Sequence, residues 1–547
     1  MKKKAILSVI GKIKGFVRSV SGTPPIALEA CADNMSIIDY KIHGNSIQDG
    51  TPSPDNPIEV QSVGKKTKNL FDEELLLSNS NATKTDDGYK LAGYPVIYDS
   101  SSSLIKHIKS VLKPNVTYTL SRRFSGYKSD NIGAIWIRNS SANLVQVPFG
   151  GGIKSAKFTF TQEQIDSIAN IYIYGRNTNN LNGIFNYIQL EEGSVATDYE
   201  PYGKYKIPVT ARSKNLFDVD YYMTYNKEQE TIRGDTKFSD NFWKNDDGNG
   251  FTVKNLAYVG KYNNYPLTLK ENTQYTLSFE AEWLSTDSRA YFGIMIRYED
   301  NTYKTVIIYF SDTKQKYTLT SETNKTVGGI QIYIWQYNGT CKISNIQLEE
   351  GAAATDYEPY HEPITTNIYL DEPLRKVGDY ADYIDFKNSM VVRNTNKYIF
   401  NGSENWVLTD AQPQVNTLRC SVAFTPICKM NTAQYIKSNL LNCVSLANID
   451  EENMFFALIT NISYIALRIN RSRLSTEDTA GFKKFLQELY SNDTPFMIYY
   501  PLAVPIETSI SLPILPTLKG ITTVYEVGTT IQPSNMEAEY YSTLKGE

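Results

Sequence analysis

Short runs of alternating hydrophobic and polar residues recur along most of the chain and are separated by turn-forming residues. Residues 275–283, YTLSFEAEW, place Tyr, Leu, Phe, Ala and Trp on one side and Thr, Ser and two Glu on the other. This period of two predicts an antiparallel strand with one buried face. The pattern as a whole predicts a mostly β fold of sandwich or jelly-roll domains. Earlier strands are predicted near residues 116–121, 132–138, 156–160, 170–174 and 184–190.

Two segments have the spacing of an amphipathic helix instead. Residues 103–112 place their apolar side chains on one helical face, and Lys113 and Pro114 then end the helix. A second helix is predicted to open at residues 476–478, Thr-Glu-Asp, because its apolar positions up to Leu489 form one stripe.

The N-terminal 20 residues are basic and carry a narrow apolar stripe. The stripe residues lie three or four apart and are Ile6, Ile10, Ile13 and Val17. Gly11 and Gly15 weaken the prediction of a helix. Two interpretations remain open at this point, namely a docking helix or strand and a helix that lies on a membrane surface.

A phrase of fifteen residues occurs twice, with thirteen positions identical between residues 188–202 and 346–360. Shorter phrases precede both copies in the same order, which indicates a tandem duplication of a unit of about 140–150 residues, the size of one domain. Most of the length difference between the copies falls before Tyr275, so an early loop is predicted to be longer in the second copy. The matched phrases are 69–72 with 215–218, 118–121 with 275–278, 137–138 with 296–297, and 171–174 with 332–335.

The repeats divide the chain into consecutive segments. We expect an N-terminal leader and small β module, two jelly-roll repeats joined by a short linker at residues 203–212, a β connector, and a C-terminal β domain that carries one helix. The predicted boundaries are 1–64, 65–202, 213–360, 361–390 and 391–547.

Composition narrows the possible functions. A net charge of −4 on 55 basic and 59 acidic residues argues against nucleic-acid binding, which usually needs a basic surface. No run of 18 apolar residues is present, so no membrane span is predicted. The five cysteines show no metal-ligand spacing and only three histidines accompany them, so we interpret the cysteines as reduced, small apolar residues. No catalytic motif is found, and the chain is predicted not to be an enzyme.

Several phrases resemble minor structural, tail-tip or baseplate proteins of phages and prophages of Gram-positive bacteria. They are residues 40–64, the KNLFD openings, the IQLEEG to DYEPY closings, residues 367–386 and residues 531–541. The resemblance implies a virion protein assembled in the host cytoplasm, with other tail proteins as partners and a host polysaccharide or teichoic acid as ligand. It also implies that the repeats are similar to carbohydrate-binding modules, and it favours a homotrimer.

Adjacent glutamates close both repeats, at Glu191-Glu192 and Glu349-Glu350. Neighbouring residues of a strand point to opposite faces, so these pairs are unsuited to glycoside hydrolysis, which needs two carboxyl groups facing one bond. Two interpretations remain: a hydrogen-bonded strand end, or a structural Ca²⁺ site of the kind that the resemblance implies near a domain terminus. Asp72 and Asp218 are the further candidate ligands for that ion.

Aromatic residues recur on one face of corresponding strands and are candidates for stacking on sugar rings. The alternative is that they pave the outer sheet face or lie under a neighbouring domain. The candidate glycan-binding residues are Trp136, Arg138, Tyr172 and Tyr174 in the first copy and Arg297, Tyr333 and Trp335 in the second.

Two alternative functions follow from the same sequence. The chain could be a purely architectural tail subunit whose repeats are spacers, or the accessory-module region of a secreted polysaccharide-active enzyme. The architectural hypothesis predicts no glycan affinity, whereas the enzyme hypothesis predicts turnover of cell-wall glycan.

Overall fold

The computed structural model describes residues 20–22, 26–30, 39–76, 82–85, 88–91, 96–99, 102–125, 132–148, 150–175, 183–229, 241–255, 259–266, 269–284, 291–334, 339–409, 416–424, 436–444, 451–459, 462–513, 520–526 and 536–539. Its sheets are antiparallel, and the prediction of a mostly β protein is confirmed. The apolar stripe of the N-terminal leader lies outside the described residues.

Both predicted helices are present. α1 (Ser102–Val111) buries Leu104 and Ile108, and α5 (Thr479–Ser491) buries Phe482 and Leu486. Asp478 caps α5 because its side chain accepts a hydrogen bond from the Gly481 amide at 2.9 Å. Among the described residues, the structure also contains α2 (Gln162–Ser167) and α3 (Val219–Gln229), which were not predicted.

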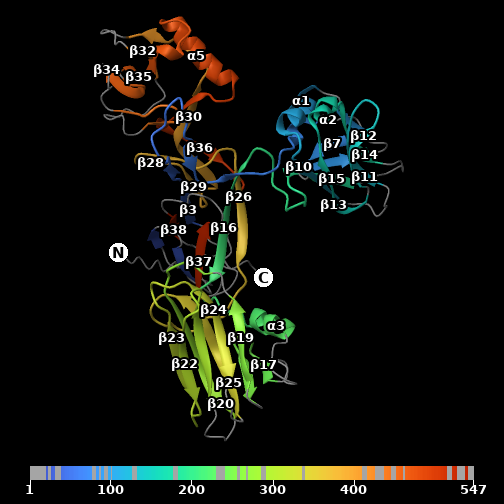
Figure 1. Cartoon of the computed structure of the whole chain (residues 1–547), viewed down its shortest axis with the longest axis vertical. Helices are drawn as coiled ribbons and strands as arrows, with labels where there is room; N and C mark the ends of the chain where they lie inside the picture. The colour runs from blue at the N-terminus through green and yellow to red at the C-terminus, as the bar shows by residue number, and fades with distance from the viewer. Residues whose placement is uncertain are drawn as a thin grey trace, which may run out of the picture.

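The first repeat is a sandwich of two sheets with one core between them (Figure 1). The larger sheet contains, in spatial order, β13 (Gly152–Thr159), β10 (Thr117–Ser125), β15 (Gly183–Glu192), β8 (Gly88–Leu91) and β7 (Ala82–Thr85). The smaller sheet contains β12 (Asn143–Val147), β11 (Ile132–Arg138), β14 (Asn170–Gly175) and β9 (Val96–Asp99).

The second repeat has the same strand order in both sheets, as expected of a tandem duplication. Its larger sheet contains β23 (Gln315–Thr320), β20 (Tyr275–Trp283), β25 (Gly339–Glu350), β18 (Phe251–Asn255) and β17 (Phe242–Lys244). Its smaller sheet contains β22 (Tyr303–Tyr309), β21 (Tyr291–Tyr298), β24 (Val327–Ile334) and β19 (Val259–Pro266). α3 lies in the early part of this repeat, where the longer loop was predicted.

Both repeats also share a β-bulge at the same place. The register between β10 and β15 shifts after Ser121, and the register between β20 and β25 shifts after Ser278. The corresponding residues on the partner strands, Tyr187 and Asn345, have left-handed backbones with φ of 56° and 52°. Asparagine tolerates this conformation more easily than tyrosine does, so the first repeat carries the more strained version of the bulge.

Residues 203–212 are not a linker, which corrects the prediction made from the sequence. They belong largely to β16 (Tyr205–Ser213), a mostly buried strand within a five-stranded sheet. That sheet runs in the order β2 (Ile26–Ala30), β37 (Gly520–Glu526), β16 and β26 (Ile364–Leu370), and β6 (Lys65–Lys66) also pairs with β16.

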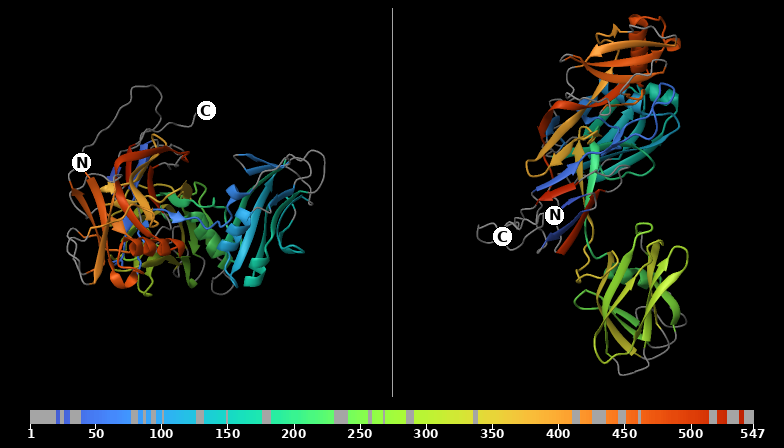
Figure 2. Two further views of the ribbon diagram at one scale, coloured as in Figure 1. Left: turned by 90° about the horizontal axis from the view of Figure 1, so that it is seen from above. Right: turned by 90° about the vertical axis from the view of Figure 1, so that its left-hand side faces the viewer.

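The segments 1–64, 361–390 and 391–547 are interleaved in the structure instead of following one another as separate units. A seven-stranded sheet combines β1 (Val20–Gly22), β38 (Met536–Glu539), β3 (Asp39–His43), β29 (Tyr383–Asp385), β30 (Met390–Phe400), β36 (Phe496–Ser509) and β33 (Lys437–Ser438). A cluster that includes Ile42, Val209, Ile368 and Ile384 joins it to the five-stranded sheet. We call this pair of sheets the central module, and the two repeats extend from it in different directions (Figures 1 and 2).

The end of the central module opposite the second repeat carries a smaller unit with α5 (Figure 1). Its four-stranded sheet contains β31 (Val407–Leu408), β32 (Thr417–Ala423), β35 (Ile462–Asn470) and β34 (Asn453–Ile459). Two hairpins, β4 (Ser46–Ile47) with β5 (Gln61–Ser62) and β27 (Lys376–Val377) with β28 (Tyr380–Ala381), and the 3₁₀ turns η1 (Glu73–Leu75) and η3 (Arg471–Arg473) complete the described elements. None of the described helices is long and apolar enough to span a membrane.

Candidate functional site

The structure brings three of the predicted glycan-binding residues of the first repeat together. Trp136 on β11 is the cross-strand partner of Tyr172 on β14, and their ring centroids are 6.4 Å apart. The Arg138 guanidinium lies over the Tyr172 ring, 5.1 Å from its centroid. All three side chains are half-buried, so part of each remains open to solvent. We call Trp136, Tyr172 and Arg138 the aromatic face.

The strand alternation explains why these side chains point away from the core. Ile135 and Ile137 on β11 and Ile171 and Ile173 on β14 are buried between the two sheets. Successive side chains of a strand alternate between faces, so Trp136, Arg138 and Tyr172 lie on the outer surface of the smaller sheet. Backbone pairing continues the row from Trp136 to Gln146 on one side and from Tyr172 to Tyr98 on the other.

The second repeat does not reproduce the aromatic face, which corrects the alignment made from the sequence. Ile135 pairs with Ile173 in the first copy, and Ile294 pairs with Ile332 in the second, so the sheet register equates Tyr172 with Gln331. The same register equates Trp136 with Met295, and Met295 and Gln331 are paired with each other and buried. The match of the phrases 171–174 and 332–335 therefore differs by two residues from the correspondence that the sheet register gives for β14 and β24.

Of the remaining candidate glycan-binding residues, the structure describes the side chain of Arg297 but not those of Tyr174, Tyr333 and Trp335. Tyr174 pairs with Ala134 and Tyr333 pairs with Gly293 in the backbone register, but the side chains of both tyrosines lie outside what the structure describes. Trp335 lies outside the described residues altogether. Arg297 keeps the position of Arg138, and its Nη2 donates to Asn301 Oδ1 at 2.7 Å.

Glu191 in the first repeat and Glu349 in the second each join the last strand of their own repeat to the segment that follows it. Glu191 is buried, and its carboxylate accepts hydrogen bonds from Gln189 Nε2 at 2.7 Å, the Thr197 amide at 3.0 Å and the Thr197 hydroxyl at 2.6 Å. In the second repeat, Glu349 accepts from Gln347 Nε2 at 2.7 Å, the Thr355 amide at 2.9 Å and the Thr355 hydroxyl at 2.7 Å. The structure thus shows a hydrogen-bonded strand end, one of the two interpretations left open by the sequence.

Two asparagines complete this arrangement and were missed as candidates. Asn69 Oδ1 accepts from the Phe71 and Leu190 amides, and its Nδ2 donates to the Ile188 carbonyl at 2.9 Å. Asn215 makes the corresponding bonds in the second repeat. The repeated KNLFD and LEEG phrases therefore fasten the start of each repeat to its last strand, and we call this arrangement the clasp.

The other four carboxylates predicted as Ca²⁺ ligands each contact different protein groups. Glu192 lies 3.4 Å from Lys113 Nζ, and Glu350 lies 2.9 Å from Lys270 Nζ. Asp72 accepts from the Glu74 amide, and Asp218 accepts from the Asp220 and Tyr221 amides, so both cap short turns or helices. Across the described parts of the chain, no three His, Cys, Asp or Glu side chains gather as a metal site would require.

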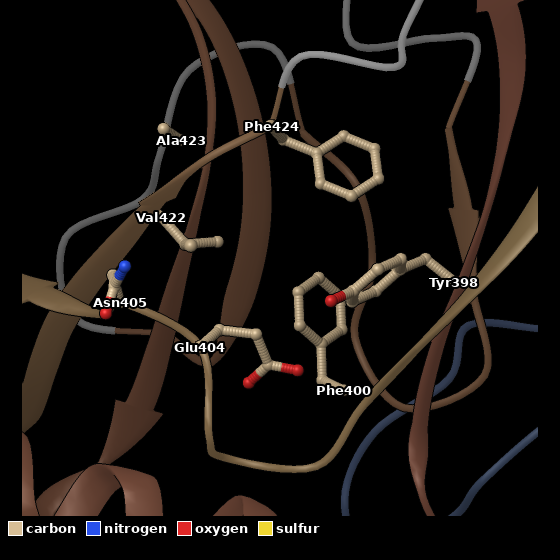
Figure 3. Close-up of a pocket in the computed structure, with 7 residues that line it drawn as sticks. All are labelled: Tyr398, Phe400, Glu404, Asn405, Val422, Ala423 and Phe424. Carbon is tan, nitrogen blue, oxygen red and sulfur yellow. The ribbon is translucent and has the colours of Figure 1, made fainter.

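Sequence reasoning also missed a pocket in the unit that carries α5. The pocket has a volume of about 340 Å³. Tyr398, Phe400, Glu404, Val422 and Phe424 surround the open space in Figure 3. These residues come from two strands and an intervening loop, and they contain no motif that local sequence could reveal.

Comparisons with known proteins add little to this picture. No protein-family model and no curated protein matches the chain. The N-terminal tandem CBM22-1–CBM22-2 domains of Paenibacillus barcinonensis Xyn10C share 9% identity with a TM-score of 0.21, over 53% of this chain and 100% of that one. VP2 from an infectious bursal disease virus subviral particle shares 8% identity with a TM-score of 0.11, over 96% and 81% of the two chains. Similarities this weak carry no argument about function.

The fold itself therefore defines the class of protein. This is a multi-unit, mostly β protein in which two sister sandwiches extend from a central module. Within it, the aromatic face is present in the first sandwich and replaced in the second.

Proposed function

We propose that the protein is a structural component of a phage tail tip or baseplate and that its first repeat binds a glycan of the host cell wall. The observation that supports glycan binding is the aromatic face, where Trp136, Tyr172 and Arg138 lie together on an outer sheet surface. The virion context rests on the sequence phrases that resemble tail proteins. In this proposal the protein is assembled in the host cytoplasm, joins other tail proteins and performs no catalysis.

The chemistry of the aromatic face suits a sugar ligand. The C–H groups of a pyranose can pack on the Trp136 and Tyr172 rings, while the Arg138 guanidinium can donate hydrogen bonds to hydroxyl, carboxylate or phosphate oxygens. Arg138 is already positioned by its contact with Tyr172. A polymer that carries both sugar rings and anionic groups, such as a teichoic acid, fits these features better than a neutral, purely apolar ligand.

The second repeat is proposed to act as a spacer. At the positions of Trp136 and Tyr172 it carries Met295 and Gln331, which are buried and cannot stack on a sugar ring. This difference between sister sandwiches favours a mixed role over the purely architectural alternative. Under this proposal, one repeat recognises the ligand and the other sets its distance from the central module.

The test is binding of the full chain to purified host cell walls, comparing Trp136→Ala with the unaltered protein. Loss of the indole should weaken binding about tenfold, because stacking buries apolar surface worth roughly 1–2 kcal/mol. The melting temperature should change little, since Trp136 lies outside the core cluster of its repeat. Tyr309→Ala is the matched control, because Tyr309 is a 65% exposed aromatic residue on the second repeat.

Unchanged wall binding by Trp136→Ala would refute the proposed site. Equal losses in both variants would mean that exposed aromatic residues act nonspecifically. Release of soluble sugars from the walls by the unaltered protein would support the enzyme alternative.

We further propose that the protein works as a homotrimer. Single protein–sugar contacts are weak, so several copies of the aromatic face on one assembly would give firm attachment through avidity. Light scattering of the full chain should report a mass three times that of the monomer. A monodisperse monomer at micromolar concentration would contradict the trimer and leave avidity to the assembled tail.

A further inference from the structure

The pocket beside α5 combines aromatic rings with a carboxylate. Tyr398 and Phe400 lie on β30, and Phe424 follows β32. The ring of Tyr398 meets Phe400 at 4.8 Å and Phe424 at 5.3 Å between centroids, both nearly edge to face. Phe400 and Phe424 are almost fully buried, whereas Tyr398 is half-buried. The Glu404 side chain faces the same space (Figure 3).

The Glu404 carboxylate is held in place by neutral donors. Its Oε1 accepts from the Asn401 amide, and its Oε2 accepts from the Gly402 amide and Trp406 Nε1, each at 3.0 Å. No Lys, Arg or His nitrogen of the described chain lies within 4.0 Å of this carboxylate. Neutral donors fix the position of the carboxylate, and none of the cations of the described residues is close enough to cancel its charge, so these residues give the pocket a negative potential.

The loop that carries Glu404 is itself fixed against α5. Gly402 has φ of 81°, and a Cβ at this position would lie 2.3 Å from the Lys483 carbonyl oxygen. Only glycine therefore allows this approach, which places residues 401–404 firmly on the helix. The carboxylate is presented by a rigid turn, as expected of a preorganised site.

We propose that this pocket binds a small organic cation, either a quaternary ammonium group or a protonated amine. Aromatic faces attract such cations through the ring quadrupole, and a nearby carboxylate adds a complementary charge. A metal ion is a poor fit because Glu404 belongs to no group of three or more His, Cys, Asp or Glu side chains among the residues placed in the structure. An anion is excluded by the charge of Glu404. This proposal does not depend on glycan binding by the first repeat.

Tyr398 supports the assignment electrostatically. Burial raises the pKa of its hydroxyl, and the negative charge of Glu404 raises it further. The phenol therefore stays neutral across the physiological range and adds no charge of its own to the pocket. The face of a tyrosine ring attracts a cation through its quadrupole.

The test uses the full chain and two probes of similar shape, tetramethylammonium chloride and the neutral neopentyl alcohol. Ligand-observed NMR should detect binding of tetramethylammonium and much weaker binding of the alcohol. Glu404→Gln should weaken tetramethylammonium binding about tenfold by removing the charge. Tyr398→Phe should bind as the unaltered protein does, because it keeps the ring. Glu488→Gln, on the exposed surface of α5, is the matched control and should bind normally.

Glu404 also accepts hydrogen bonds from the backbone of its own loop, so Glu404→Gln could weaken binding by disturbing the loop. A second variant separates this structural effect from the loss of charge. Tyr398→Leu leaves the three donors to Glu404 in place and removes one aromatic ring, so it too should weaken binding. The proposal is overturned if the alcohol binds as well as tetramethylammonium, if neither probe binds the unaltered protein, or if Tyr398→Leu and Glu404→Gln both retain full affinity.

A third comparison identifies the source of the cation. Oligomers of glucosamine carry protonated amines, whereas oligomers of N-acetylglucosamine do not. Preferential binding of the glucosamine oligomer would support a cation carried on a polymer. Binding of tetramethylammonium with no preference between the oligomers would support a free cationic solute.

Discussion

At the scale of single residues, Asp382 is a fully buried carboxylate in the central module. It accepts hydrogen bonds from the Arg375, Asn394 and Thr395 amides and from the Thr395 hydroxyl. Arg393 Nη1 lies 3.1 Å from the same carboxylate. Burial lowers the pKa of Arg393, and the charge of Asp382 partly offsets that effect. Arg393 and Asp382 thus form a salt bridge that is largely removed from solvent.

Asp382→Ala should destabilise the central module strongly. Removing Asp382 leaves the Arg375, Asn394 and Thr395 amides without their acceptor. It also leaves Arg393 without its carboxylate partner, although Arg393 still donates to the Pro373 and Glu372 carbonyls. Breaking a buried pair in this way typically costs about 3–5 kcal/mol. Calorimetry should show a lowered transition for the central module. Asp371→Ala is the control, since Asp371 pairs with Lys204 at the surface and is 83% exposed. If both variants melt alike, Asp382 does not have this structural role.

At the scale of elements, the clasp gives a structural role to the phrase that is repeated at residues 188–202 and 346–360. Gln189 Oε1 accepts from the Glu200 amide at 2.8 Å, and Gln347 Oε1 accepts from the Glu358 amide at 2.9 Å. The last strand of each repeat is thereby joined to the segment that leads back to the central module. The same bonds in both copies account for the near identity of the two phrases.

Thr197→Val and Thr355→Val test the clasp in one repeat at a time. Each change removes a hydroxyl donor from a buried glutamate and should cost about 1.5–3 kcal/mol, the usual range for a hydrogen bond to a charged group. Differential scanning calorimetry should show that each variant lowers a different transition, that of its own repeat. A shift of the same transition in both variants would mean that the repeats do not unfold independently.

At the scale of the whole molecule, the two ends of the chain build one module. β37 pairs with both β2 and β16, and β38 pairs with both β1 and β3. Strands more than 300 residues apart in sequence therefore share each sheet of the central module. The sandwich repeats, by contrast, are continuous segments with their own cores.

A chain that stops at residue 513 should lose the central module and keep both repeats. It lacks β37 and β38 and leaves a buried edge of β16 without a partner, which favours aggregation. Hydrogen exchange should become fast in β16 and stay slow in β10 and β20. A chain that stops at residue 539 keeps both strands and serves as the control; equal protection of β16 in the two chains would contradict the expectation.

The sequence by itself determined the features that depend on local periodicity. Alternation predicted β10, β11, β14, β15 and β20, because side-chain direction in a strand follows from the backbone. Helical spacing predicted α1 and α5 for the same reason. The duplicated phrases also predicted two domains of one topology, since copied sequence carries copied patterns of burial.

Tertiary structure alone decided the features that depend on pairing between distant segments. Residues 203–212 resemble a linker because they contain Pro208 and charged residues. On one side of β16, the residues before Pro208 pair with β6 and the residues after it pair with β37. Pro208 itself has no paired neighbour on that side, so its missing N–H costs the sheet no hydrogen bond there. The correspondence of Tyr172 with Gln331 follows from the sheet register and not from the local sequence similarity. The partners of Glu191 and Glu404 likewise depend on which strands and turns meet, because a carboxylate bonds to whatever donors folding places beside it.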